Sequence, residues 1–352
     1  MSLKQLISTG TKVWLDSIEP TQIKKNRDMG ATGATSNPII IADIIKAGGF
    51  DEKIQKLADQ GLSEADSAWQ LNDQLVRDAQ QVFLPVWEQT RGNDGYVSFE
   101  VDPLLEDVTA QQPMPHDQRV RKYVELARRW AEGHRNRMIK IPATDAGIAA
   151  MEEVAASGVT VNVTLIFSRR QYIASRDAIW RGAQRRKAGL SGFKSVYSIF
   201  ISRVDVYTEK YVPQLSKDAQ GKVGIVNVKK LWRLNQEFWK DKKLPLQQEI
   251  IFASTGKKLP WQSDDYYIEA LAGSDIQTNP PATNEFVEKS SKQYTRQVDQ
   301  LPSDAIVREI EQKVDEDKLE KKLMEEGTAK FAEPQKALQH LIGEKRAALT
   351  AR

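Results

Sequence analysis

The chain contains no cysteine and only three histidines among its 352 residues. Without cysteine it can form neither a disulfide framework nor a zinc–thiolate site, and it lacks a thiol nucleophile. The histidines, His116, His134 and His340, are scattered and show no metal-ligand spacing. The sequence therefore predicts neither a metal site nor thiol chemistry.

An excess of one charge and a long apolar run are also missing. The 51 basic and 48 acidic residues give a formal net charge of +3, which is too small to indicate a nucleic acid partner. No stretch approaches the roughly 20 apolar residues needed to span a membrane. The N-terminal segment also lacks the apolar region of a signal peptide. We therefore predict a cytoplasmic protein that binds neither nucleic acid nor membrane.

Short strand-like segments and helical stretches alternate along most of the chain. The segments predicted to contain the strands are 12–16, 30–38 (a strand and a turn), 96–103, 138–141, 159–167, 195–203, 249–253 and 274–278. Alternation of this kind predicts a parallel sheet, and eight units predict a (β/α)₈ TIM barrel. We expect one barrel over residues 1–301, with additional helices at both ends of the chain.

The sequence changes character over residues 302–352, which are rich in Glu and Lys. We predict charged amphipathic helices over 304–316, 318–324 and 334–348. No Pro/Gly/Ser linker separates them from the preceding segment, so we expect a helical extension packed on the barrel exterior rather than a free domain.

Lys140 lies in the middle of the apolar segment Met138-Ile139-Lys140-Ile141, where a charged group is costly. Pro142 is expected to end this strand, and a loop then leads into a helix near Ile148. Burial disfavours the ammonium form of a lysine, and a neutral amine is a nucleophile that can form a Schiff base with a ketone. The alternative is a lysine that reaches water at the strand edge or pairs with a carboxylate.

Polar residues stand at or near the end of most predicted strands. They are Asp16, Asn37, Glu100, Lys140, Thr164, Ser198 and Ser254. Each alone has a structural explanation; Asp16 and Asn37, for example, can each cap a following helix. A TIM barrel would bring all seven to the carboxyl-terminal rim, where such barrels hold their active sites. Their coincidence favours a functional site.

Seven segments of the sequence resemble the transaldolase family, in the family's order, over roughly residues 12–284. They are Gly33-Ala34-Thr35-Ser36-Asn37-Pro38-Ile39-Ile40, Phe99-Glu100-Val101-Asp102, the Lys140 segment 138–148, Asn162-Val163-Thr164-Leu165-Ile166-Phe167-Ser168, Phe200-Ile201-Ser202-Arg203-Val204-Asp205, Ala253-Ser254-Thr255-Gly256 and Thr278-Asn279-Pro280-Pro281. The resemblance implies a class I aldolase-type barrel. Such an enzyme of the pentose phosphate pathway moves a dihydroxyacetone unit between sugar phosphates and needs no metal or organic cofactor.

The resemblance also implies a role for individual residues. Lys140 would form the Schiff base, and Asp16 would act as the base for the C4 hydroxyl. Glu100 and Thr164 would hold a water that carries protons. Asn37 and Ser198 would bind the hydroxyls of the dihydroxyacetone unit.

The predicted phosphate end departs from the family pattern. Arg203 matches a family arginine that contacts phosphate, but the family's second arginine is absent from the segment Ser254-Thr255-Gly256-Lys257-Lys258. We expect a turn at Ser254–Gly256 that opens a helix and offers N–H groups to an anion, with Lys257 supplying charge. Ile199 stands where the family commonly has proline.

Two alternatives remain open from the sequence. One is a fructose 6-phosphate aldolase-type enzyme that releases free dihydroxyacetone; such enzymes usually lack the glutamate corresponding to Glu100. The other is a barrel that binds sugar phosphates, or a partner through its C-terminal helices, without turnover. Members of the family occur as monomers and as homodimers, and the sequence does not choose between them.

Overall fold

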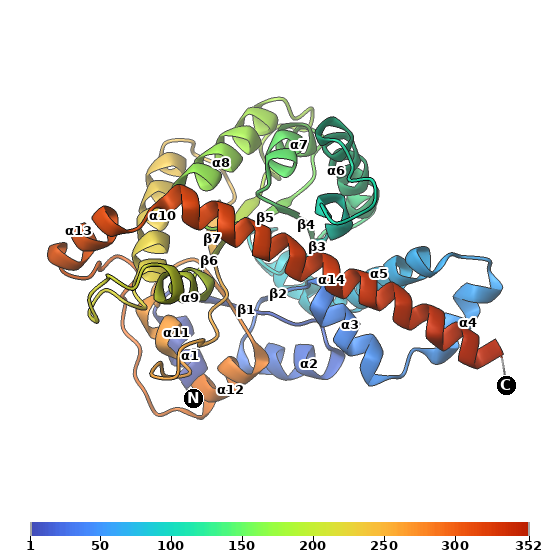
Figure 1. The fold of residues 1–352 in the computed structure, drawn as a ribbon, viewed down its shortest axis with the longest axis horizontal. Coiled ribbons are helices and arrows are strands. Elements are labelled where there is room, and N and C mark those ends of the chain that lie inside the picture. The colour runs from blue at the N-terminus through green and yellow to red at the C-terminus, as the bar shows by residue number, and fades with distance from the viewer. Residues whose placement is uncertain (1, 351–352) are drawn as a thin grey trace.

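The computed structural model describes residues 2–350 and contains a closed barrel of eight parallel strands (Figure 1). The strands are β1 (Lys12–Leu15), β2 (Gly33–Thr35), β3 (Val97–Glu100), β4 (Arg137–Pro142), β5 (Val161–Ile166), β6 (Ser195–Phe200), β7 (Glu249–Ala253) and β8 (Ile276–Asn279). Each strand pairs with the next along the chain, and β8 closes the barrel by pairing with β1. The predicted (β/α)₈ barrel is therefore confirmed.

Helices connect the strands and surround the barrel (Figure 1). They are α1 (Ser2–Ser8), α2 (Pro20–Met29), α3 (Pro38–Ala47), α4 (Asp51–Asp59), α5 (Glu64–Gln89), the 3₁₀ helix η1 (Pro103–Glu106), α6 (His116–Ala131), α7 (Asp145–Ala156), α8 (Arg169–Gln184), α9 (Ser202–Tyr211), α10 (Val223–Lys240), α11 (Tyr266–Ala270), α12 (Pro281–Lys289), α13 (Asp304–Lys313) and α14 (Glu316–Thr350). Among residues 2–350, no helix is long and apolar enough to cross a membrane.

Alternate residues of each strand face the barrel interior. These inward-facing residues are apolar in one part of the interior and polar in another. Trp14 and Met138 belong to a buried apolar cluster. Gly33 gives the Trp14 ring its space, since a Cβ on this residue would lie 2.6 Å from a ring carbon. The polar part includes Asn162, whose amide donates to Ser98 Oγ and accepts from Ser198 Oγ, each at 2.8 Å.

Pro142 is the last residue of the Lys140 strand, so the expected end of this strand is confirmed. Two other strand boundaries differ from the predictions. The strand over 195–203 ends at Phe200 instead, and α9 begins at Ser202. Within 30–38, predicted as a strand and a turn, the strand is only three residues long, Gly33–Thr35. Proline is tolerated in a strand where no ladder hydrogen bond needs its nitrogen.

The C-terminal segment differs more from its prediction. The helices predicted over 318–324 and 334–348 are one continuous helix, α14, with Pro334 inside it. A proline inside a helix costs about 3 kcal/mol, but buried side chains on both sides of Pro334, Phe331 and Leu338 among them, anchor the helix here.

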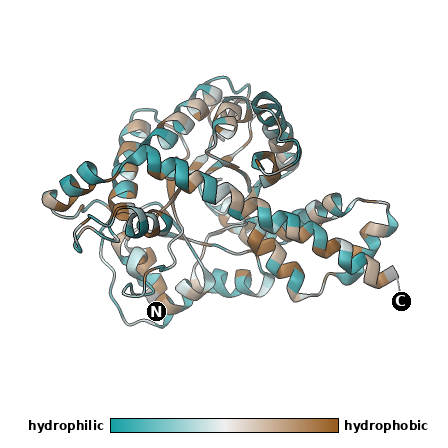
Figure 2. Cartoon of the chain, viewed as in Figure 1, coloured by the Kyte–Doolittle hydropathy of each residue, from teal (hydrophilic) through white to brown (hydrophobic). Residues whose placement is uncertain are grey.

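Helix α14 crosses one face of the barrel diagonally (Figure 1). It contacts η1 and α9 and then continues along α3, α4 and α5. Its last part packs Leu338 and Ile342 into the cluster that holds Ile41 and Ile45 of α3, a helix whose residues are mostly hydrophobic (Figure 2). The extension therefore lies across the barrel mouth rather than only along its exterior. The boundary between residues 301 and 302 stays a prediction.

Candidate active site

A cavity of about 190 Å³ lies at the carboxyl ends of the strands. Its lining residues are Asp16, Thr35, Asn37, Ile39, Lys140, Thr164, Ser198, Phe200, Arg203, Ala253, Ser254, Gly256, Lys258, Thr278, Pro280 and Phe331. Seven of the nine residues predicted for the site are in this lining. Of the other two, Glu100 contacts Lys140 directly and Lys257 is directed elsewhere.

Lys140 and Glu100 form a buried ion pair because strands β3 and β4 place them side by side in register. The Lys140 Nζ atom lies 3.0 Å from Glu100 Oε2 and donates to the Ser36 carbonyl at 3.2 Å. Both side chains are nearly inaccessible to solvent. Burial raises the pKa of the Glu100 carboxyl although the neighbouring Lys140 opposes the shift. Proton exchange between this carboxyl and a group bound at Lys140 is therefore favoured.

Asp16 follows β1 and enters the same cavity. Its Oδ1 atom accepts a hydrogen bond of 2.9 Å from Thr35 Oγ1, and Thr35 in turn lies 3.0 Å from Thr278 Oγ1. These two threonines end or nearly end β2 and β8. They fix the orientation of the Asp16 carboxylate, whose second oxygen makes no hydrogen bond among the described residues.

Two buried polar atoms of the site, the Thr164 Oγ1 and the Arg203 Nη1, have no hydrogen-bond partner among residues 2–350. Leaving such a group unpaired costs about 1–3 kcal/mol. Burial also lowers the pKa of Arg203, while Asp16 and Glu100 oppose this shift. Both atoms therefore keep their hydrogen-bonding capacity for a ligand in the cavity.

Backbone geometry departs from regular structure beside two of the site residues. Leu165, next to Thr164, has a φ of 55°, and β5 shifts register against β6 between Val163 and Ile166. Ser254, after β7, has a φ of 59°, and its hydroxyl lies 2.8 Å from Ser202 Oγ. Left-handed backbone is uncommon outside glycine and is often found at functional sites.

Asn37 combines a structural position with an available donor. Its Oδ1 atom caps α3 by accepting from the Ile40 N–H at 3.1 Å. The amide nitrogen makes no hydrogen bond among residues 2–350. The capping role and the predicted ligand-binding role are therefore compatible, because they use different atoms.

The turn after β7 differs from its prediction. It opens no helix, since α11 begins only at Tyr266. Lys257 does not line the cavity, and its ammonium pairs with Asp264 at 2.8 Å. The neighbouring Lys258 lines the cavity instead. The structure therefore favours Lys258 over Lys257 as the cation of this turn.

Sequence reasoning missed five of the polar or aromatic lining residues: Thr35, Phe200, Lys258, Thr278 and Phe331. The first four stand in or beside segments that resemble the transaldolase family, so their position at strand ends was a usable signal. Phe331 comes from α14, and no local pattern connects it with Lys140. Among residues 2–350, no three His, Cys, Asp or Glu side chains are grouped so as to hold a metal ion.

Comparison with known proteins agrees with this geometry. The model of the family described as transaldolase/fructose-6-phosphate aldolase matches residues 13–342. A protein named Transaldolase 2 from Streptomyces avermitilis is 35% identical over 306 residues, which cover 81% of this chain and 80% of the relative. A protein named Transaldolase from Saccharopolyspora erythraea is also 35% identical, over 80% of each chain. The chain therefore belongs to the transaldolase/fructose-6-phosphate aldolase family, and the predicted enzyme, a transaldolase that transfers an aldehyde or ketone residue, is confirmed.

Proposed function

We propose that Lys140 is the Schiff-base nucleophile of this transaldolase. The observation that carries the proposal is the pairing of Lys140 with Glu100 inside a cavity of polar side chains at the carboxyl rim. The donor substrates are sedoheptulose 7-phosphate and fructose 6-phosphate. The acceptors are glyceraldehyde 3-phosphate and erythrose 4-phosphate.

The reaction begins when the Lys140 ammonium passes a proton to Glu100, and the resulting neutral amine attacks the C2 carbonyl of the ketose phosphate. A carbinolamine forms and loses water to give an iminium ion, and Glu100 and Thr164 hold the water that carries the protons. Asp16 then removes the proton of the C4 hydroxyl. The C3–C4 bond breaks, its electron pair moves into the iminium to form an enamine, and an aldose phosphate leaves.

The enamine retains three carbon atoms of the donor until an acceptor arrives. Its C3 carbon attacks the aldehyde carbon of the acceptor, and the alkoxide that forms takes a proton from Asp16. Addition of water to the resulting iminium releases the new ketose phosphate and restores the Lys140 amine. Asn37 and Ser198 hold the hydroxyls of the three-carbon unit during both halves of the reaction.

The phosphate group is proposed to bind Arg203 and Lys258, with Ser254 beside them. Arg203 offers a planar donor pair and Lys258 a point charge, so recognition is bidentate at only one of the two cations. Lys257 is paired with Asp264 and would contribute only after that ion pair opens.

A second candidate function is that of a fructose 6-phosphate aldolase, which releases free dihydroxyacetone. Glu100 in contact with Lys140 and the relatives named transaldolase favour transfer over release. We also propose a cytoplasmic location, no nucleic acid partner, and either a monomer or a homodimer as the active form.

The test is reduction with borohydride in the presence of fructose 6-phosphate, followed by peptide mass spectrometry. A dihydroxyacetone-sized adduct on Lys140 is expected, and added erythrose 4-phosphate should abolish it by completing the transfer. The Lys194→Gln variant is a matched control, because Lys194 is also a buried lysine paired with a glutamate, but at the amino end of the barrel. An unmodified Lys140 in folded protein, or an adduct on Lys194, would refute the proposal.

A further inference from the structure

Helix α14 brings an aromatic side chain from the far end of the sequence to the proposed Schiff-base lysine. The Phe331 ring centre lies 5.7 Å from Lys140 Nζ and 5.7 Å from the guanidinium carbon of Arg203. Phe331 lines the cavity and is only 4% exposed. The ring therefore forms a wall that touches both the proposed nucleophile region and the proposed phosphate region.

The approach of α14 to the barrel depends on a glycine one helical turn before Phe331. A Cβ on Gly327 would lie 3.2 Å from Leu165 Cδ2 and 3.8 Å from Arg203 Nη1. Glycine inside a helix costs about 1 kcal/mol relative to alanine. This cost is consistent with a helix whose close approach to the mouth is needed at this turn.

Contacts on both sides of Phe331 hold α14 across the mouth. Before it, the Glu320 carboxylate accepts hydrogen bonds from Ser168 Oγ and Arg170. After it, Lys336 pairs with Asp107 at 2.7 Å. Because these partners lie on two different connections of the barrel, one after β5 and one after β3, the Phe331 ring is fixed relative to the strands from both sides.

The size of the cavity places the ring close to any bound ketose. At about 190 Å³, the cavity is smaller than the roughly 300 Å³ at the lower limit of most small-molecule sites. One water occupies about 30 Å³, so a three-carbon unit leaves room for few waters. Removing the Phe331 ring would add space beside Lys140 that water could fill.

We propose that Phe331 is a specificity-determining residue that shields the enamine on Lys140 from water, so that the three-carbon unit is transferred rather than released. This inference rests on the proposed role of Lys140. Release requires that C3 of the enamine take a proton derived from water. A second water then adds to the iminium carbon and frees dihydroxyacetone and the Lys140 amine. An apolar ring opposes the first of these steps by excluding the water that would protonate C3. The second step uses the water held by Glu100 and Thr164, as transfer does, so the attack of C3 on an acceptor aldehyde and the final hydrolysis are unaffected.

The experiment measures two rates with fructose 6-phosphate as donor. One is dihydroxyacetone release without an acceptor, and the other is sedoheptulose 7-phosphate formation with saturating glyceraldehyde 3-phosphate. The Phe331→Ala variant should raise the ratio of release to transfer about tenfold. Phe331→Leu, which keeps an apolar side chain, should restore most of the wild-type ratio. Phe331→Gln, which replaces the ring with a polar side chain that favours helix, should raise the ratio as Phe331→Ala does, and it serves as the test variant should Phe331→Ala fail to fold.

Leu338→Ala provides the matched control. Leu338 is also a buried apolar residue of α14, only 1% exposed, but it packs in the cluster with α3 rather than in the cavity. It should lower stability without changing the ratio. An unchanged ratio in Phe331→Ala, or an equal rise in Leu338→Ala, would overturn the inference. Borohydride trapping on Lys140 is run on every variant, so loss of the adduct in the wild-type protein would instead refute the proposed nucleophile.

Discussion

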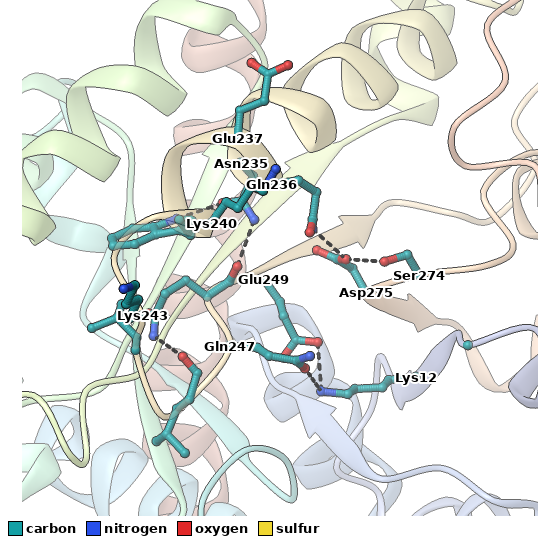
Figure 3. A pocket seen from close by; sticks show the side chains of 15 residues that line it. Lys12, Asn235, Gln236, Glu237, Lys240, Lys243, Gln247, Glu249, Ser274 and Asp275 are labelled. Atoms are coloured by element: carbon teal, nitrogen blue, oxygen red, sulfur yellow. Dashed lines mark hydrogen bonds and ion pairs between the residues drawn. The ribbon is translucent and has the colours of Figure 1, made fainter.

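The two ends of the barrel both hold buried lysine–carboxylate pairs, but they differ in what surrounds these pairs. At the carboxyl end, Lys140 pairs with Glu100 beside a cavity of about 190 Å³. At the amino end, Lys194 and Lys12 both pair with Glu249. The cavity at this second site is larger, about 610 Å³ (Figure 3). Cavity volume alone would therefore point to the wrong end of the molecule.

The charged groups beside the amino-end cavity are engaged with each other and with the backbone. Lys194 Nζ also donates to the Gln247 carbonyl at 2.6 Å. Asp275 accepts from the Trp232 indole at 3.0 Å and from the Ile250 N–H at 2.8 Å. In the cavity at the carboxyl end, by contrast, the Thr164 hydroxyl and an Arg203 nitrogen are buried without partners in the described part of the chain. Such atoms also occur near the amino end, on Thr32 and Arg137, but on none of the described residues that line the larger cavity. Available hydrogen-bonding groups in the cavity wall, rather than space, therefore distinguish the cavity suited to chemistry.

The two glutamates also differ in how burial is compensated. Burial raises the pKa of Glu100, and its one close lysine does not offset this shift. Burial acts in the same direction on Glu249, but Lys194 and Lys12 together hold its pKa below the ordinary value. Glu249 therefore stays charged as a structural anchor, whereas Glu100 is suited to taking up a proton during a reaction.

The largest expected effect comes from replacing the lysine at each end. Lys140→Met should lower turnover more than about 10⁴-fold, because the Schiff base cannot form. Its effect on stability should be small, since the Glu100 carboxyl can take up a proton when the lysine is gone. Lys194→Met should instead lower the free energy of unfolding by about 3–5 kcal/mol, because it leaves the buried Glu249 carboxylate short of a partner.

Sugar-phosphate transfer assays measure the turnover of the two variants, and urea unfolding measures their stability. Lys140→Met should lose turnover, and Lys194→Met should lose stability. The turnover of folded Lys194→Met should match that of the wild-type protein. Normal turnover in Lys140→Met would refute the proposal that the lysine at the carboxyl end carries out the reaction. A Lys194→Met protein as stable as wild type would show that the amino-end pair is not an anchor.

Much of the site could be predicted because its residues interrupt apolar strands. Lys140 stands inside a buried strand, and Thr164 lies two residues after Asn162 on the same strand face. The alternation of strands and helices then places such residues at one rim. Residues on loops escaped this logic, because neighbours such as Lys257 and Lys258 point in different directions on an irregular turn. Phe331 escaped it entirely, since an amphipathic helix pattern does not reveal where the helix docks.

A smaller effect on the pH dependence of stability is expected at Asp205, a buried carboxyl held by hydrogen bonds rather than by a lysine. Asp205 is fully buried and accepts hydrogen bonds from Tyr267 Oη and the Gly224 N–H, each at 2.8 Å. Burial raises the pKa of its carboxyl to about 7. Between about pH 4 and pH 7 the folded protein keeps a proton here that the unfolded chain releases, so this carboxyl lowers stability as the pH rises. Asp205→Asn should remove that loss. As the pH rises, its free energy of unfolding should therefore increase relative to that of the wild-type protein, by roughly 4 kcal/mol at most.

Urea unfolding of Asp205→Asn from pH 4 to pH 8 measures the difference. Glu249→Gln is the control of opposite sign. The Glu249 pKa is lowered in the folded state, so its charge contributes stability above about pH 4.5, and that contribution is lost as the pH falls. The stability of Glu249→Gln should therefore fall furthest below that of the wild-type protein at neutral pH and approach it in acid. Parallel pH curves for Asp205→Asn and the wild-type protein would contradict the assignment.

The smallest expected effect compares single hydroxyls at the two ends. Thr164→Val removes a hydroxyl without a partner, keeps a β-branched shape in the strand and should leave the free energy of unfolding within about 0.5 kcal/mol. It should lower turnover about 10–100-fold, because proton transfer at Lys140 loses a group that holds water. Ser195→Ala removes a hydroxyl that donates to Gln248 Oε1 at 2.7 Å, so it should cost about 1–2 kcal/mol of stability and leave turnover unchanged. If Thr164→Val lost stability but kept turnover, the unpaired hydroxyl would be structural, and unsatisfied groups would no longer distinguish the two cavities.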